Sequence, residues 1–296
     1  MTTIGVRNLH LDLGMQENQS ATDYYGIPYN VVNGSTLTWS TFAFDSAEDY
    51  SDESECATGS AHTLVSPCVS STTPMPQMPI PASPLLESGI TTALDGDDHH
   101  LLVVDSAACR LWEAYNSYRP SSGVWHFNGV ATWDLNSNAL RPAGWTSSDA
   151  AGFPVVPLLL RPDEASAGEI RHALRFTLPS GQIRRPYVWP ARHATGTATA
   201  MTAPQMGQLF RIKSSYVIPS NFNVQARAIV QALKTYGVYL SDIGSSMYIQ
   251  GTPSANWSSM TISQVQSVSS AEFEAVDLTP ITSRPNFDPN SAAASP

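Results

Sequence analysis

Short runs of strand-forming residues, separated by turn residues, dominate this sequence and limit the folds that it can adopt. Val, Ile, Thr, Tyr, Phe and Trp gather in about a dozen short runs. Gly, Pro, Asn and Asp recur between them at the spacing typical of antiparallel β proteins. The pattern predicts a mainly β fold: an antiparallel, jelly-roll-like β-sandwich or a barrel, with one or two helices packed on it. We expect residues 1–280 to form a single domain and 281–296 a loose C-terminal tail.

The predicted elements follow from local signals. A helix is expected over 223–236, because apolar residues recur at helical spacing, an Asn stands at its start and Gly237 follows its end. Shorter helices are expected over 162–167 and 261–268. Turn residues between neighbouring runs predict hairpins. The predicted hairpins are 29–32 with 36–42, 101–105 with 109–115, 124–127 with 130–135, and 238–242 with 247–250; further strands are predicted at 169–178, 183–189 and 209–213.

The charge balance excludes some classes of partner. Charged residues make up only 14% of the chain, the net charge is −10, and the only lysines are Lys213 and Lys234. Nucleic acids and anionic membrane surfaces are bound by basic patches, so neither is expected as a partner. No apolar run approaches the length of a membrane span.

A polar, lysine-poor, acidic composition is typical of secreted proteins. Glycosylation triplets at Asn18, Asn33 and Asn256 agree with this. The N-terminus has no leader pattern, so either a leader has been removed or the chain is cytosolic, and we expect the first, an extracellular glycoprotein. Cys56 and Cys68 lie in one loop-like stretch and are predicted to form a disulfide worth roughly 3 kcal/mol. Cys109 lies in an apolar strand pattern and is predicted to be a free, buried thiol.

An acidic stretch precedes the first cysteine. Its carboxylates are expected to form a solvated loop or, alternatively, a calcium site, since hard cations take several carboxylate oxygens. The spacing is not that of a twelve-residue EF-hand loop. The residues are Asp45, Glu48, Asp49, Asp52, Glu53 and Glu55.

The segment 144–193 holds the densest mixture of polar, titratable and apolar residues. Within it, alternation along the predicted strand 169–178 places His172 in a row with Ile170, Leu174 and Phe176. His172 is therefore either a core histidine bonded to a carbonyl group or a histidine on the wall of a cleft.

Several long segments resemble a family of secreted bacterial and fungal proteins of unknown activity. They are GWTSSDAAGFPVVPLLLRPDE, GEIRHALRFT, YVWPARH and QALKTYGVYLSDIGSSMYIQG, and the resemblance covers roughly residues 75–275. The resemblance does not indicate which reaction, if any, the protein catalyses. It does imply an Asp-x-His motif at the start of a hairpin strand, here Asp98-His99-His100, and it leaves open which of the two histidines matters.

The first functional hypothesis is a secreted carbohydrate-active enzyme, most simply a polysaccharide hydrolase. Such enzymes need a pair of carboxylates across the sugar bond, and Asp149 and Glu169 are the candidates. His172 and His100 would orient substrate or move protons. Seven tryptophans and eleven tyrosines could supply sugar-stacking surfaces. The candidate substrate-binding residues are Asp98, Trp145, Arg175, Tyr187, Arg192 and His193.

Three alternatives remain open. A polysaccharide lyase would use His172 or Tyr187 as base and Arg175 or Arg192 to neutralise a uronic acid. A non-catalytic glycan-binding or cell-surface module would use the aromatic residues alone. A histidine metal centre would need His172, His193, Asp98 and His100 to meet, but no known ligand spacing supports it, and no metal or other cofactor is predicted.

Overall fold

The computed structural model describes residues 5–14, 26–46 and 49–293, and its strands form three sheets. The prediction of a mainly β fold is confirmed, with four α-helices in the described part of the chain. The sheets contain both parallel and antiparallel pairs, and none of them closes into a barrel. No helix among these residues is both long and apolar enough to cross a membrane. Asn18 and Glu48 lie outside the described residues.

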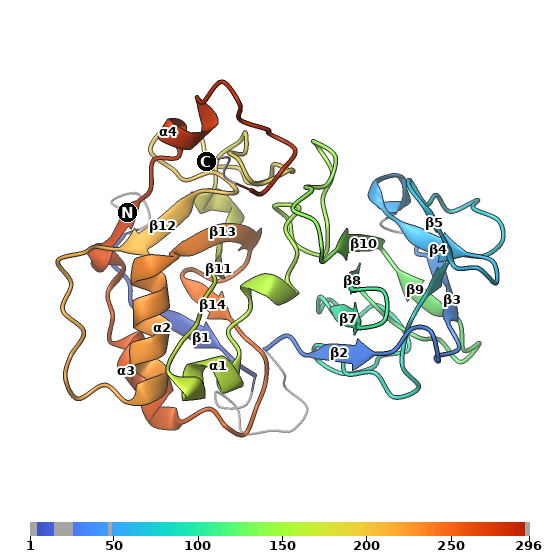
Figure 1. Cartoon of the computed structure of the whole chain (residues 1–296), viewed down its shortest axis with the longest axis horizontal. Coiled ribbons are helices and arrows are strands. Elements are labelled where there is room, and N and C mark those ends of the chain that lie inside the picture. The colour runs from blue at the N-terminus through green and yellow to red at the C-terminus, as the bar shows by residue number, and fades with distance from the viewer. Residues whose placement is uncertain (1–4, 15–25, 47–48, 294–296) are drawn as a thin grey trace.

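The four-stranded and the five-stranded sheets form what we call the N-terminal lobe (Figure 1). One sheet has the order β10-β8-β7-β2 and the other the order β5-β4-β6-β3-β9. Their facing side chains, including Phe42, Trp112, Trp125 and Phe127, form one apolar core, as in a β-sandwich. The strands are β2 (Tyr29–Val32), β3 (Ser40–Phe44), β4 (Cys56–Thr58), β5 (Thr63–Val65), β6 (Gln77–Met78), β7 (Leu101–Asp105), β8 (Arg110–Tyr115), β9 (Trp125–Phe127) and β10 (Gly129–Asp134).

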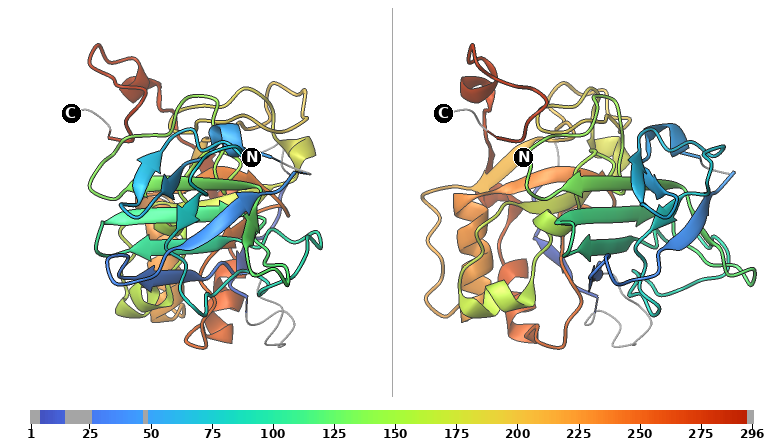
Figure 2. Two further views of the ribbon diagram at one scale, coloured as in Figure 1. Left: turned by 90° about the vertical axis from the view of Figure 1, so that its right-hand side faces the viewer. Right: turned by 45° about the vertical axis from the view of Figure 1, so that its right-hand side comes forward.

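The C-terminal lobe is built on the six-stranded sheet β1-β14-β11-β13-β12-β15, with helices beside it (Figure 1). Helix α2 buries Ile229 and Leu233 in the same core as Phe176 and Phe210 of the sheet. The strands are β1 (His10–Asp12), β11 (Leu174–Leu178), β12 (Leu209–Ile212), β13 (Val238–Ile243), β14 (Tyr248–Gln250) and β15 (Phe273–Ala275); the helices are α1 (Pro162–Ala167), α2 (Val224–Thr235), α3 (Ser259–Gln266) and α4 (Thr279–Thr282). Residues 135–160 lead from β10 of the N-terminal lobe to α1 of the C-terminal lobe, and we call them the connecting segment; Figure 2 shows the molecule from two further directions.

The predicted helices are present, because their signals are local. The Asn223 side chain accepts a hydrogen bond of 2.8 Å from the backbone nitrogen of Ala226 and caps α2. Gly237 follows the helix with φ +79°, a conformation that favours glycine. Helices α1 and α3 also lie within two residues of their predicted bounds.

Of the predicted hairpins, only that between β7 and β8 forms; the other three predictions were wrong. Strand β11 lies between β13 and β14, β2 pairs with β7 in parallel, and β9 pairs with β3 in parallel. The predicted strand 183–189 is not a strand, and the strand predicted to begin at residue 169 begins at Leu174. Turn residues show where the chain bends, but the partner of each strand is chosen by long-range burial.

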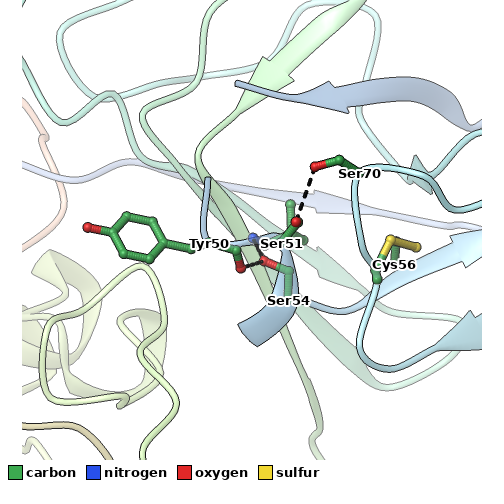
Figure 3. Close-up of a disulfide and its surroundings, with 7 residues drawn as sticks. Tyr50, Ser51, Ser54, Cys56 and Ser70 are labelled. Atoms are coloured by element: carbon green, nitrogen blue, oxygen red, sulfur yellow. Dashed lines mark hydrogen bonds between the residues drawn. A yellow bond between two sulfur atoms is a disulfide. The ribbon is translucent and has the colours of Figure 1, made fainter. Parts of the chain in front are cut away.

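The disulfide between Cys56 and Cys68 is confirmed, and it lies in the buried core of the N-terminal lobe. Beside it, the Ser54 hydroxyl donates to the Tyr50 carbonyl oxygen (2.8 Å), and the Tyr50 ring points away from the disulfide (Figure 3). The expectation for Cys109 was wrong: this thiol is exposed. Cys109 has φ +48° in the turn between β7 and β8, so its side chain belongs to the turn and not to a strand face.

The C-terminal segment, expected to be loose, is bound along part of its length. The backbone nitrogen of Leu140 donates to Asn290, and the Trp189 indole donates to the Ser291 carbonyl oxygen at 3.1 Å. The Arg192 guanidinium also donates to the Pro289 carbonyl oxygen at 2.7 Å. Residues 289–292 therefore lie against residues 138–140 of the connecting segment and against residues 189–192.

Candidate functional site

A pocket of about 380 Å³ opens where the two lobes meet the connecting segment. Asp98 and Tyr115 come from the N-terminal lobe, and Asp242 and His193 come from the C-terminal lobe. The phenol of Tyr115 donates to the Asp98 carboxylate at 3.3 Å. No Arg or Lys is among the residues that line the pocket. Its other walls are formed by Tyr50, Thr146, Ser147, Ser148, Ala150, Thr195 and Ile243.

A buried arginine lies behind the carboxylate of Asp242. The guanidinium of Arg175, on β11, donates to Asp149 at 2.8 and 3.1 Å and to Asp242 at 3.1 Å. It also donates to the Gln250 side chain. Arg175 and Asp149 are completely buried, whereas the Asp242 side chain is 17% exposed. Of this group, Asp242 lines the pocket.

Asp149 and Asp242 share one cation, Arg175, and both carboxyl groups have a raised pKa. Burial raises the pKa of both Asp149 and Asp242. The pKa of Asp242 reaches about 7, because the charge of Asp149 adds to the effect of burial and outweighs the opposing charge of Arg175. The charge of Asp98 raises it further. A proton is therefore retained on Asp242 close to neutral pH, beside a pocket that contains a second carboxyl group.

A β-bulge positions Asp242. Strands β11 and β13 pair in parallel, but the register shifts so that Phe176 faces Leu240 and Thr177 faces Asp242, leaving Ser241 as the extra residue. A bulge of this kind changes the direction in which the following side chain points. Its backbone is also held, since the nitrogen of Ala151 donates to the Ser241 carbonyl oxygen at 2.8 Å.

A tight loop carries the polar wall of the pocket. The Ser147 hydroxyl donates to the Phe153 carbonyl oxygen at 2.7 Å, and the Gly152 nitrogen donates to the Asp149 carbonyl oxygen at 2.9 Å. Gly152 has φ +76°, and a Cβ atom there would lie 2.6 Å from the carbonyl oxygen of Trp145. Glycine is thus required where the loop closes on itself.

His100 connects the two sides of the pocket without lining it. Its Nδ1 binds the Glu87 carboxylate, and its Nε2 donates to the Ser148 carbonyl oxygen at 2.7 Å. Burial alone would lower the pKa of this imidazole, but the adjacent Glu87 carboxylate raises it to about 10. His100 is therefore a buried imidazolium that holds the loop of Ser148 against β7.

Two further carboxylates of the N-terminal lobe hold the connecting segment. Glu113, on β8, accepts hydrogen bonds of 2.9 Å from the backbone nitrogens of Val155 and Val156. Glu55 accepts a hydrogen bond of 2.5 Å from Arg141. Burial raises the pKa of Glu55, and it raises that of Glu113 to about 7. The walls of the pocket are therefore fixed to both lobes by buried polar contacts.

Two predicted catalytic residues lie away from the pocket. Glu169 is exposed and pairs with Arg171 at 2.8 Å. His172 binds Glu164 at 3.0 Å through Nε2 and donates to the Ala173 carbonyl oxygen through Nδ1. Both residues precede β11 because the strand is shorter than predicted, so the expected alternation does not apply to them.

The predicted substrate-binding residues are divided between the pocket and its surroundings. Asp98 and His193 line the pocket, and His193 donates from Nδ1 to the Ala150 carbonyl oxygen at 2.9 Å. Tyr187 packs against the core of the C-terminal lobe. The Trp145 ring packs under the Arg141 guanidinium, whose Cζ atom lies 5.3 Å from the centroid of that ring. Arg192 is 4% exposed and binds the C-terminal segment.

The residues of the alternative histidine metal centre do not come together. Within the described ranges, the only His, Cys, Asp or Glu side chains grouped closely enough to hold a metal ion are Asp95, Asp97 and His99. Asp95 and Asp97 are exposed, and His99 already binds Asp95 at 2.7 Å and two backbone carbonyl groups. His172 and His193 are held by Glu164 and Ala150 respectively, so neither joins His100.

Asp242 is the carboxylate of the pocket that was not predicted from the sequence, and Tyr50 and Tyr115 were not predicted either. The sequence offered one signal, a carboxylate at the end of an apolar strand with a glycine two residues later. That signal is common at hairpin turns, and the significance of Asp242 comes from Arg175 and Asp149, which are distant in sequence. No family model, curated protein or solved structure matches this chain.

Proposed function

We propose that this protein is a secreted glycoside hydrolase that acts in the pocket between the lobes. The observation that carries the proposal is the presence of two carboxyl groups, Asp98 and Asp242, from different lobes in one pocket. Hydrolysis of a sugar bond uses one protonated and one ionised carboxyl group. Asp242 is the general acid, since its pKa is raised to about 7 by burial and by Asp149.

Asp98 is the second carboxylate, acting as base or nucleophile. It is exposed to solvent, and the phenol of Tyr115 donates to it at 3.3 Å, which fixes its orientation. Tyr50 and Tyr115 line the pocket and offer aromatic rings to the apolar faces of sugar rings. His193 offers its Nε2 to substrate hydroxyl groups, because its Nδ1 is committed to Ala150.

The walls favour an uncharged glycan. A uronic acid needs a cation to neutralise its carboxylate, and the pocket lining contains neither Arg nor Lys. Arg175 and Arg192, which a lyase would need, are buried and bound to other groups. A lyase acting on acidic polysaccharides is therefore the weaker alternative. The disulfide supports the extracellular part of the proposal, since disulfides persist in oxidising compartments.

A polysaccharide panel tests the proposal. The protein would be incubated with neutral glucans, xylans and mannans and with pectate and alginate, and both reducing ends and the ultraviolet absorbance of unsaturated sugars would be followed. We expect reducing ends from a neutral glycan without unsaturated products. The variants Asp242→Asn and Asp98→Asn should each lower the rate by about 10²-fold or more.

The matched control is Asp163→Asn, an exposed aspartate in the first turn of α1, which should leave the rate unchanged. Unsaturated products from pectate would instead indicate a lyase. Binding to a glycan without turnover would indicate a binding module and would refute the hydrolase proposal.

A further inference from the structure

A second pocket lies on another part of the junction between the lobes, and nothing in the proposed hydrolysis uses it. Its volume is about 390 Å³, within the range of small-molecule sites. Its walls come from the end of β10, from the connecting segment, from Tyr239 on β13 and from Ala292 near the C-terminus. Figure 1 shows β10 and β13 on either side of the connecting segment.

We propose that this second pocket binds a small, uncharged aromatic molecule that carries a hydrogen-bonding oxygen. Three aromatic side chains from separate parts of the chain meet around it: Trp133, Phe153 and Tyr239. The rings of Phe153 and Tyr239 are tilted by 58° with centroids 5.3 Å apart. The Arg141 guanidinium lies 5.7 Å from the Trp133 ring centroid and helps to hold that ring in place.

The hydroxyl group of Tyr239 provides the polar contact. Its ring packs against the core of the C-terminal lobe and is partly exposed where it lines the pocket, burial raises its pKa, and the hydroxyl makes no hydrogen bond to a described residue. The hydroxyl is not one of the fully enclosed polar atoms that lack a partner, so a molecule in the pocket can become its hydrogen-bond partner. An oxygen of a bound ligand would supply that partner at the wall of an otherwise apolar pocket.

The remaining polar side chains of the lining are those of Asp134, Ser137 and Asn138, at the end of β10 and on the exposed turn after it, and they argue against an anion or a sugar. No Arg, Lys or His lines the pocket, so an anion would lack a counter-charge. Asp134 and Ser137 accept hydrogen bonds from Asn136 and Ala139 within their own turn. A sugar would bring many hydroxyl groups to a pocket with few free polar partners, and burying them unpaired is costly. An aromatic ring with one oxygen matches this lining better.

The test uses 4-ethylphenol as the probe, with binding followed by calorimetry and by ligand-observed nuclear magnetic resonance. We expect saturable binding with a dissociation constant at or below about 1 mM. Ala292→Trp, at an exposed residue on the rim, should abolish binding without altering the core. Leu158→Trp, at another residue that lines the pocket, is a second blocking variant.

Tyr239→Phe should weaken binding about fivefold, because it removes one hydrogen bond and retains the ring. The matched control is Tyr236→Phe, an exposed tyrosine at the end of α2, which should leave the affinity unchanged. The charged analogue 4-ethylbenzoate should not bind. Absence of saturable binding by the unaltered protein, or equal affinity in a folded Ala292→Trp variant, would overturn the proposal. Neither result depends on whether the other pocket hydrolyses a glycan.

Discussion

His100 donates a hydrogen bond of 2.7 Å from Nε2 to the carbonyl oxygen of Ser148, and this contact joins the N-terminal lobe to the loop that forms a wall of the candidate site. The other ring nitrogen binds Glu87, so both nitrogens face acceptors and the ring carries a positive charge. The imidazolium is buried with its carboxylate partner.

Replacing His100 by Ala should therefore lower the free energy of unfolding by about 3–5 kcal/mol, because a buried carboxylate and a buried carbonyl group lose their partner. Urea denaturation measures the change. The double variant Glu87→Gln with His100→Ala removes the unpaired charge and should be less destabilised than the single variant. Equal stability of the single variant and the unaltered protein would show that the pair contributes nothing.

If Asp242 is the general acid, the rate of hydrolysis should fall as the pH rises through about 7, because Asp242 then loses its proton. The measurement is kcat/KM against pH on the glycan that the panel identifies. Asp242→Asn should remove this alkaline limb as well as lowering the rate. An alkaline limb that persists in Asp242→Asn would assign the proton to another group.

Global stability should be higher at mildly acidic pH than above neutrality. Burial raises the pKa of Glu113 from 4.5 to about 7, so the folded state holds a proton that the unfolded state releases near pH 4.5. The stabilisation is fully present below pH 4.5 and is lost as pH rises through 7; it amounts to a few kcal/mol. The raised pKa of Asp242 likewise makes the folded state less stable as pH rises through about 7. The raised pKa of His100 has the same effect as pH rises from 6.5 through about 10.

Urea denaturation midpoints at mildly acidic and mildly alkaline pH measure this dependence. Glu113→Gln should flatten it, because the amide does not titrate. The aspartates with lowered pKa, such as Asp134 and Asp277, are exposed, so their opposing contributions are screened by solvent. Stability that increases steadily from acidic to alkaline pH would contradict the expectation.

Removing the disulfide should lower the free energy of unfolding by about 3 kcal/mol, since it closes a short loop in the unfolded chain. The double variant Cys56→Ser with Cys68→Ser introduces polar groups into a fully buried site, which adds to the loss. Thermal and urea denaturation of the double variant and of the unaltered, disulfide-bonded protein would measure the difference in the free energy of unfolding. An unchanged midpoint would mean that the apolar core holds this region without the covalent bond.

Cys109 should react with a thiol reagent in the native protein. It is exposed in the β7–β8 turn, whereas the other two cysteines are bonded to each other. A colorimetric thiol assay without denaturant should detect one equivalent, and Cys109→Ser should abolish the signal. Reaction only after denaturation would mean that this thiol is covered in solution.

Part of the fold was predictable because its causes are close together in sequence. Asn223 and Gly237 mark the ends of α2, the short turn between the runs 101–105 and 109–115 predicts the β7–β8 hairpin, and the spacing of Cys56 and Cys68 allows a disulfide. Each of these signals involves residues within one element or one turn. The prediction failed where the partner is remote, as when β11 enters between β13 and β14.

In the candidate site, too, some residues could be predicted from the sequence and others depend on partners that are distant in the chain. Asp98 and His193 were selected from the sequence and line the pocket. Asp149 and His100 were also selected, but they lie behind it, bound to Arg175 and Glu87. Whether a polar residue faces a pocket or supports one depends on which groups surround it, and sequence spacing does not contain that information.

The sequence by itself determined that the chain is mainly β, where α2 begins and ends, and that its surface is acidic and poor in lysine. Alternation, capping and charge are properties of neighbouring residues, so they can be read directly. Only the tertiary structure decided which strands pair, that Asp98 and Asp242 share a pocket, and that burial and the charge of Asp149 raise the pKa of Asp242 to about 7. These properties depend on burial and on charges brought together from distant parts of the chain.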